Sequence, residues 1–284
     1  MKIDKLGVVG IGNIGTGVVH SLAESGYKVV AVDILPKALE KAKKEIEKNS
    51  LYYCLYSHKK PKDPKEILGN IEFTTNYEKL AECSYIIENV TEDLELKEKV
   101  HQKINEVCKK DAIVAVNTSC ISITKMASLR ERPETVIGMH FMNPVPIMDA
   151  VEVIEGSYTS EETIEISKEL LKGLGKEGIL VKDSPGFVSN RVMTFMINEA
   201  VYLVQEKVAS VDDIDRLFRK CYGQKMGPLE TCDLIGIDTI LNSMIVLYES
   251  FNDSKYRPCP LLRKMVYEGK LGKKSGEGFY KYNF

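Results

Sequence analysis

Short, wholly apolar runs alternate with amphipathic stretches through residues 6–181. Apolar runs of this kind are typical of strands buried on both faces of a parallel sheet, and the amphipathic stretches predict helices. The predicted strands are residues 6–9, 27–32, 71–74, 84–90, 113–116, 135–139, 150–154 and 178–181. The main predicted helices between them are residues 13–25, 36–48, 94–108 and 160–174. A regular alternation of strand and helix indicates an α/β domain.

The pattern becomes wholly helical after residues 183–186, which read Asp-Ser-Pro-Gly. The helices expected beyond this point are residues 187–206, 211–222, 238–251 and 260–268. Their apolar faces need burial against one another and against a second copy of the chain, so we expect a homodimer. The sequence therefore predicts an α/β domain over residues 1–186 and an all-α C-terminal domain over residues 187–284.

A glycine-rich turn joins the first predicted strand to the first helix. Gly10 permits the tight turn, Gly12 lets the backbone approach a pyrophosphate, and Gly15 lets helix and strand pack closely. The helix that follows presents free N–H groups to the phosphates. This arrangement is typical of a Rossmann-type, doubly wound sheet that binds a dinucleotide, although glycines of a purely structural turn have the same spacing.

Asp33 ends the second predicted strand and follows Gly12 at the distance expected for a ribose-binding carboxylate. A carboxylate there accepts both ribose hydroxyls of NAD and repels the 2′-phosphate of NADP. Ile34 supplies no compensating positive charge. We therefore expect NAD as the cofactor.

One histidine stands out at the end of a strand-like run. His140 follows residues 135–139, a turn over residues 143–146 contains two prolines, and Glu152 lies in the next apolar run. Neighbouring strands joined by such a turn can bring an imidazole and a carboxylate together, and a carboxylate fixes the tautomer of a histidine that moves protons. The simpler alternative is an ordinary histidine beside a surface acid.

Polar residues collect where two further strands end, after residues 84–90 and after residues 113–116. Open α/β sheets bind their ligands at this edge. By residue type alone, Ser119 is read as a turn or cap residue, and so is Asn190, which comes just after a Pro-Gly pair.

Composition excludes several classes of protein. A net charge of −2 with a pI near 6.2 lacks the excess of positive charge that is typical of proteins that bind nucleic acid. No apolar stretch is long enough to span a bilayer, and no signal segment is recognisable. The 7 cysteines are scattered without a CxxC pair, which argues against a disulfide framework and against a metal site. We expect a cytoplasmic protein without a metal.

The segment from residue 49 to residue 70 is too long for a simple connection. It is rich in tyrosine at first and then strongly basic over residues 58–65. We expect a projecting helical or loop element. It is either a solvated surface segment or a positive projection that holds the phosphates of a large substrate.

The motifs taken together resemble the NAD-dependent L-3-hydroxyacyl-CoA dehydrogenases, a family that includes 3-hydroxybutyryl-CoA dehydrogenases. The resemblance runs the whole length of the chain. It is carried by GVVGIGNIGTG (7–17), IIENVTEDLELK (86–97), NTSCISIT (117–124), GMHFMNPVPIMDAVEVI (138–154), DSPGFVSNRV (183–192), MGPLETCDLIGIDT (226–239) and LLRKMVYEGKLGKKSGEGFYKY (261–282). Single motifs are generic, but this ordered set is specific for the superfamily, though not for one substrate.

The resemblance implies a role for each matching residue. His140 is implied to be the base that removes the 3-hydroxyl proton, with Glu152 as its orienting partner. Ser119 and Asn190 are implied to form hydrogen bonds to the substrate oxygens. The positions implied to line the cofactor and the site are Gly10, Gly12, Asn13, Ile14, Gly15, Asp33, Glu92, Lys97, Asn117 and Asn143.

The chain departs from the family pattern around the substrate. Asp149 stands where a basic residue is usual, Lys225 where proline is usual and Met142 where an aromatic residue is common. Residues 52–65 also differ from the usual sequence pattern of the element that contacts coenzyme A in the family. One alternative is therefore the same chemistry on a thioester of acyl carrier protein, as in the synthesis of hydroxymalonyl-type extender units. Carrier proteins are acidic, and Lys59–Lys65 could dock one. A second alternative is a non-catalytic relative, as among lens crystallins.

Overall fold

The computed structural model describes residue 3, residues 5–57 and residues 62–282, with only the backbone described for residues 51 and 54–57. The chain divides into two compact units, Met1–Asp183 and Ser184–Phe284. The division falls within the Asp-Ser-Pro-Gly segment, slightly before the boundary that we expected after residue 186. Each unit is described by itself below.

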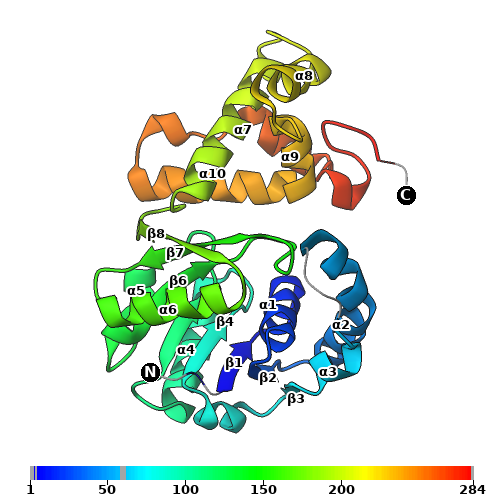
Figure 1. Ribbon diagram of the computed structural model, residues 1–284. Coiled ribbons are helices and arrows are strands. Elements are labelled where there is room, and N and C mark those ends of the chain that lie inside the picture. The colour runs from blue at the N-terminus through cyan, green and yellow to red at the C-terminus, as the bar shows by residue number, and fades with distance from the viewer. Residues whose placement is uncertain (1–2, 4, 58–61, 283–284) are drawn as a thin grey trace. The chain divides into compact units, whose positions relative to one another are not determined.

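The first unit is built on an 8-stranded sheet with the order β3-β2-β1-β4-β5-β6-β7-β8 (Figure 1). The strands are β1 (Lys5–Val9), β2 (Lys28–Val32), β3 (Ile71–Thr74), β4 (Tyr85–Glu88), β5 (Ile113–Val116), β6 (Val136–His140), β7 (Ala150–Glu155) and β8 (Glu177–Lys182). Every neighbouring pair is parallel except β6 and β7, which are antiparallel. The sheet confirms the expected Rossmann-type architecture.

Helices cover both faces of this sheet, as the wholly apolar strands require (Figure 1). They are α1 (Asn13–Glu24), α2 (Pro36–Ser57), α3 (Pro64–Leu68), α4 (Leu94–Val107), α5 (Ile123–Ala127) and α6 (Glu161–Gly173), with short 3₁₀ turns η1 (Tyr77–Glu82) and η2 (Pro133–Thr135). The side chains of β1 alternate between two cores. Leu6 and Val8 pack in the core that α1 and α6 cover, whereas Val9 packs with Ile104 of α4.

The region that we expected to project begins as regular helix. The helix predicted for residues 36–48 runs on as α2 to Ser57, and α3 follows at Pro64–Leu68 with Asp63 as its N-cap. The prediction had ended α2 too early because the tyrosine-rich stretch breaks the charged pattern without breaking the helix. Part of the basic stretch, residues 58–61, lies outside the described residues. Lys62, which is described, donates to the carbonyl of Glu24 at the end of α1 (2.7 Å).

The second unit is helical, as expected. Its elements are α7 (Ser189–Gln205), α8 (Val211–Tyr222), α9 (Pro228–Ile235), α10 (Ile237–Phe251), η3 (Ser254–Tyr256), α11 (Pro260–Tyr267) and η4 (Lys273–Ser275). The short helix α9 was not predicted, and neither was α5 in the first unit. A core that includes Ile197, Leu229, Ile240 and Leu262 holds the helices of this unit together.

Two buried carboxylates fasten the end of the chain to this helical core. Asp233 accepts hydrogen bonds from the backbone N–H groups of Phe279 and Tyr280 (both 2.9 Å) and from the hydroxyl of Tyr282 (3.0 Å). Asp215 accepts one from the hydroxyl of Tyr280 (2.9 Å). Both carboxylates are fully buried. Burial of a carboxylate is tolerated only when it is hydrogen-bonded, so these donors are needed for the stability of the unit.

Within the described part of the chain, no single helix has the length and apolar composition needed to cross a bilayer. Only α9 and α10 together reach that length, and they are bent by 98° at their junction.

Candidate active site

The antiparallel pairing of β6 with β7 places His140 directly opposite Glu152. Atom Nδ1 of His140 lies 3.0 Å from Oε2 of Glu152, and its Nε2 lies 3.3 Å from Oγ of Ser119. The histidine is 6% exposed and the glutamate 9% exposed. The structure thus brings together three of the four residues predicted to act on the substrate.

These two contacts determine which ring nitrogen of His140 carries the proton. An ionised carboxylate only accepts hydrogen bonds, so Nδ1 of His140 carries the proton that is donated to Glu152. The second nitrogen, Nε2, is then the one that can accept a proton on the side of Ser119. A buried carboxylate also stabilises the charged imidazolium that forms when Nε2 takes up a proton.

Glu92 holds the loop that carries Ser119. Its Oε1 accepts hydrogen bonds from Oγ1 of Thr118 (2.5 Å), from the N–H of Ser119 (2.9 Å) and from the N–H of Cys120 (3.0 Å). We had expected Glu92 to line the cofactor. The contacts give it a definite second task, which is to fix the serine beside His140.

Asn117 connects the end of β5 to the histidine strand. Its side-chain Oδ1 accepts from the backbone N–H of Phe141 (3.1 Å), the residue that follows His140. Its own N–H donates to the carbonyl of Glu88 (2.8 Å) at the end of β4. The polar residues that follow neighbouring strands therefore meet at one edge of the sheet, as predicted.

The three glycines of the turn occupy three different environments. Gly10 has a φ of +84°, and a Cβ built on it would lie 2.7 Å from the backbone nitrogen of Val90. A Cβ on Gly15 would overlap the carbonyl oxygen of Gly10, whereas one on Gly12 would meet nothing within 4 Å. Gly12 is thus the glycine with open space beside it, at the N-cap of α1 where the helix offers its N–H groups.

Asp33 braces this turn from the end of β2. Its Oδ2 accepts from the N–H of Ile11 (2.7 Å) and its Oδ1 from the N–H of Leu35 (2.9 Å). It also lines a cavity of about 700 Å³ together with Gly10, Gly12 and Tyr77. A cavity of this volume beside the glycine turn can hold the adenosine half of a dinucleotide.

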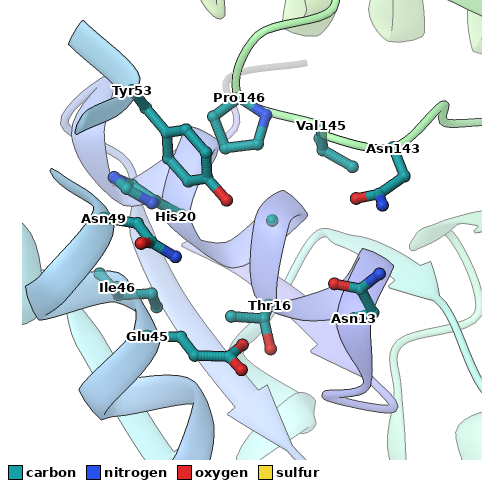
Figure 2. Close-up of a pocket in the computed structure, with 11 residues that line it drawn as sticks. Asn13, Thr16, His20, Glu45, Ile46, Asn49, Tyr53, Asn143, Val145 and Pro146 are labelled. Atoms are coloured by element: carbon teal, nitrogen blue, oxygen red, sulfur yellow. The ribbon is translucent and has the colours of Figure 1, made fainter. Parts of the chain in front are cut away.

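A smaller polar pocket lies between α1, α2 and the turn that follows β6 (Figure 2). In Figure 2 the hydroxyl of Tyr53 points into this space, and the side chains of Asn13 and Asn143 lie at its other end. Asn143 precedes a cis peptide bond to Pro144. Asn13 and Asn143, both expected to line the cofactor or the site, therefore line the same pocket. Ile14, the next residue after Asn13, is half-buried.

For Lys97, contact with the cofactor stays a prediction, and the structure shows its protein partners. It is fully buried, and its Nζ donates to both carboxylate oxygens of Glu88 (2.8 and 2.9 Å) and to the carbonyl of Asn117 (2.9 Å). Burial by itself raises the pKa of Glu88, but the nearby His101, whose Nε2 lies 3.5 Å from Oε2, and the charge of Lys97 outweigh this effect and hold that pKa below its usual range. These oxygens enclose the ammonium of Lys97, so its hydrogen bonds are made to groups of the protein.

One residue near the site was missed by the sequence analysis. Lys176 is nearly buried, and its Nζ donates to the carbonyls of Val145 (2.7 Å) and Met148 (2.5 Å), which belong to the turn between β6 and β7. A lysine after a Leu-Gly pair is typical of a charge at a helix end, so no sequence pattern predicts these two hydrogen bonds. Asn190 lies at the beginning of α7 in the second unit, and its contact with substrate stays a prediction.

In the described residues, no group of three or more His, Cys, Asp or Glu side chains is arranged to hold a metal ion. The cysteines whose side chains are described are free thiols. The contact of His140 with Glu152, in the unit that carries the glycine turn, supports acid-base chemistry.

Comparison with known proteins agrees with this geometry. Residues 5–184 match the family described as 3-hydroxyacyl-CoA dehydrogenase, NAD binding domain, and residues 186–282 match its C-terminal domain. The chain is 45% identical to a probable 3-hydroxybutyryl-CoA dehydrogenase of Deinococcus radiodurans, over 98% of this chain and 100% of that protein. It is 43% identical to a 3-hydroxybutyryl-CoA dehydrogenase of Clostridioides difficile, over 98% and 99% of the two chains.

Solved structures include a close match. The (S)-3-hydroxybutyryl-CoA dehydrogenase of Ralstonia eutropha superposes with a TM-score of 0.95 at 41% identity, and the match covers 100% of both chains. Both units of the present chain therefore have counterparts in one solved enzyme.

Proposed function

Since this chain belongs to the 3-hydroxyacyl-CoA dehydrogenase family, we propose that it interconverts a short-chain L-3-hydroxyacyl-CoA and the corresponding 3-oxoacyl-CoA. The cofactor is NAD. The observation that carries the proposal is the His140–Glu152 pair, held opposite each other across two strands. The names of the relatives, which refer to 3-hydroxybutyryl-CoA, support a four-carbon acyl group.

The residues of the nucleotide turn fit the cofactor. Gly12 leaves open space at the N-terminus of α1, where a pyrophosphate can meet the free N–H groups. Asp33 lines the adjoining cavity, and its carboxylate can accept the ribose hydroxyls while it continues to brace the turn. When bound, NAD supplies the hydride acceptor.

In our proposal, His140 acts as the general base. Its Nε2 takes the proton of the substrate hydroxyl as the carbon loses hydride, and returns it in the reverse direction. Glu152 keeps Nδ1 protonated and stabilises the imidazolium. Ser119, fixed by Glu92, donates to the same substrate oxygen, where negative charge develops in the transition state. Asn190 is proposed to donate to the thioester carbonyl.

We propose that the polar pocket of Figure 2 receives part of the thioester chain. Its walls come from α1, α2 and the turn after the catalytic strand, so it lies next to both the glycine turn and the His140 segment. Asn49 and Tyr53 supply polar contacts there, and burial together with the charge of Glu45 raises the pKa of Tyr53, which keeps that phenol neutral.

The carrier-protein alternative was drawn from the departures around the substrate, with the basic segment as its docking surface. Residues 58–61 of that segment lie outside the described residues, and Lys62 is engaged with α1. The relatives that match the full length are named for CoA esters. Steady-state kinetics separate the two substrates, since an efficiency on the carrier-protein thioester far above that on the CoA ester would favour the carrier protein.

We also propose that the enzyme is a cytoplasmic homodimer. The second unit exposes large apolar side chains, among them Leu217, Tyr222 and Tyr267, which supports burial against another copy. The free thiols support a reducing compartment. Sedimentation equilibrium checks the assembly, and a monomer mass across the micromolar range would contradict it.

The test of the proposed function is a panel of 3-hydroxyacyl-CoA esters with NAD or NADP, followed by the absorbance of the reduced cofactor. We expect the highest kcat/KM with the four-carbon L-ester and NAD. A wild-type enzyme without turnover on any ester of the panel, yet able to bind NADH, would contradict the proposal.

A further inference from the structure

The loop between β6 and β7 covers residues 141–149 and joins the two strands that carry the paired histidine and glutamate. Two contacts hold its ends. Its first residue, Phe141, donates to Oδ1 of Asn117 (3.1 Å), and the carbonyl of its last residue, Asp149, accepts from the N–H of Glu177 (2.7 Å). Neither contact reaches the middle of the loop, which therefore needs an anchor of its own.

Lys176 anchors the middle of this loop from outside. It lies between α6 and β8, where its backbone N–H donates to the carbonyl of Leu171 (2.9 Å), and it is only 6% exposed. Its Nζ donates to the carbonyls of Val145 (2.7 Å) and Met148 (2.5 Å). Removal of an ammonium group from water is unfavourable unless its donors form hydrogen bonds, and an apolar side chain would fill this space without that cost. The two hydrogen bonds compensate for the burial and fix the backbone on both sides of Pro146.

The anchored part of the loop packs directly on α1. A Cβ built on Gly17 of α1 would lie 2.9 Å from Cβ of Val145 and 3.4 Å from Cδ of Pro146, so the loop and the helix are in close contact. Val145, Pro146 and Asn143 follow one another along one side of the polar pocket in Figure 2, whose other walls are α1 and α2. The place of the loop on α1 therefore determines the shape of this pocket.

We propose that Lys176 is a positioning residue for substrate binding, which holds the loop of residues 141–149 against α1 and so sets one wall of the pocket. It acts through the carbonyls of Val145 and Met148. The inference rests on the proposed function, because this pocket is where we propose that part of the thioester chain binds. The pairing of β6 with β7 holds the His140–Glu152 pair independently of the loop, so Lys176 is assigned to substrate binding and not to proton transfer.

The first test compares Lys176→Met with the wild type, both full-length, with 3-hydroxybutyryl-CoA and saturating NAD. Methionine fills a similar volume but cannot donate, so the middle of the loop loses both hydrogen bonds. We expect the KM for the ester to rise about tenfold or more, whereas kcat stays within about threefold. The pH profile of kcat should keep its shape because His140 and Glu152 remain paired. Lys172→Met, at an exposed position near the end of α6, is the matched control and should change none of these quantities.

Two kinetic results would overturn the inference. If KM and kcat are both unchanged in a folded Lys176→Met enzyme, the lysine only supports the fold. If kcat falls more than about tenfold while KM is unchanged, the lysine acts on the chemical step instead of on substrate binding.

A second variant tests the same contact from the opposite side, and it also serves if Lys176→Met does not fold. Alanine is a better helix former than glycine, so Gly17→Ala preserves α1 while its methyl group pushes Val145 away. We expect the KM for the ester to rise about tenfold although Lys176 is intact. An unchanged KM in this variant would contradict the role of the loop.

Hydrogen exchange tests the anchor without any substrate. The N–H groups of Ile147 and Met148 donate to the carbonyl of Pro144 inside the loop (3.0 and 3.2 Å). We expect both to exchange about tenfold faster in Lys176→Met, while the N–H of Phe141, held at the start of the loop, changes less than about threefold. A wild type that turns over no CoA ester contradicts the proposed function, whereas equal exchange rates at these two amides contradict the anchor itself.

Discussion

At the scale of single residues, the pairing of His140 with Glu152 is simple enough for sequence to predict. Sequence placed His140 at a strand end and Glu152 in the next strand, and the structure has Nδ1 of His140 3.0 Å from Oε2 of Glu152. The interior partners were harder to predict. Lys97 was expected to line the cofactor, and only the three-dimensional fold reveals that Glu88 and a carbonyl surround its ammonium.

The first prediction concerns the base and its partner. His140→Ala removes the proton acceptor, so we expect kcat to fall about 10²- to 10⁴-fold. Glu152→Gln keeps the shape but can donate to Nδ1, which shifts the proton to Nε2, and we expect kcat to fall about 10²-fold or more. NADH titration should give an almost unchanged Kd in both variants. Normal turnover of His140→Ala would contradict the mechanism.

The second prediction concerns Asp33. Asp33→Ala removes the acceptor for the N–H groups of Ile11 and Leu35 as well as the proposed ribose contact. We expect the KM for NAD to rise about tenfold or more and discrimination against NADP to relax. Parallel kinetics with both cofactors check this, and an unchanged cofactor preference would contradict the assignment.

The third prediction follows from the depressed pKa of Glu88. A carboxylate whose pKa is lowered on folding stabilises the protein above its unfolded pKa of about 4.3, and this contribution is lost as the pH falls through the folded pKa. Glu88→Gln should therefore cost about 3–5 kcal/mol of unfolding free energy at neutral pH. Urea titrations at lower pH should show this difference from wild type shrinking below about pH 4, and a constant difference would contradict it.

At the scale of elements, apolar runs predicted every strand of the sheet to within a few residues. Strands buried on both faces have a strong signal, and even β8, which is largely exposed, contains the apolar run Ile179–Val181. Helix ends were less predictable. The segment of residues 52–56 continues α2, whereas the sequence left open whether it is helix or loop. The short helices α5 and α9 were missed because too few turns are present for a periodic pattern.

The fourth prediction separates two glycines of the same turn. Gly15→Ala forces a methyl group onto the carbonyl of Gly10, so we expect both a lower thermal midpoint and loss of NADH binding. Gly12→Ala meets no atom within 4 Å, so the fold should keep its midpoint while the pyrophosphate loses its close approach. Calorimetry and NADH titration of both variants check this, and equal midpoint losses would contradict it.

At the scale of the whole molecule, the chain consists of two units with separate cores. The sequence predicted the change from alternating to helical pattern but not how the helical unit is closed. That closure depends on Asp215 and Asp233, whose partners Tyr280 and Tyr282 come at the far end of the chain. Local periodicity carries no information about contacts between such distant positions.

The fifth prediction tests this closure. Asp233→Ala removes the acceptor for three donors, each costing about 1–3 kcal/mol when left unsatisfied. We expect hydrogen exchange to accelerate over residues 272–282 and in α9, while the sheet of the first unit keeps its protection. Asp253→Ala, which removes an exposed cap, is the control and should change little. Uniform acceleration throughout the chain would contradict separate stability of the units.

The pairing of β6 with β7 has one more consequence. Side chains on a strand alternate between faces, so sliding β7 by a single residue would turn Glu152 to the opposite side of the sheet and leave His140 facing an aliphatic neighbour. Nucleotide capture depends on other strands and would survive such an error. A chain folded with this shifted register would still bind its coenzyme but would lack the paired imidazole and carboxylate. The register of one antiparallel strand pair therefore determines activity separately from coenzyme binding.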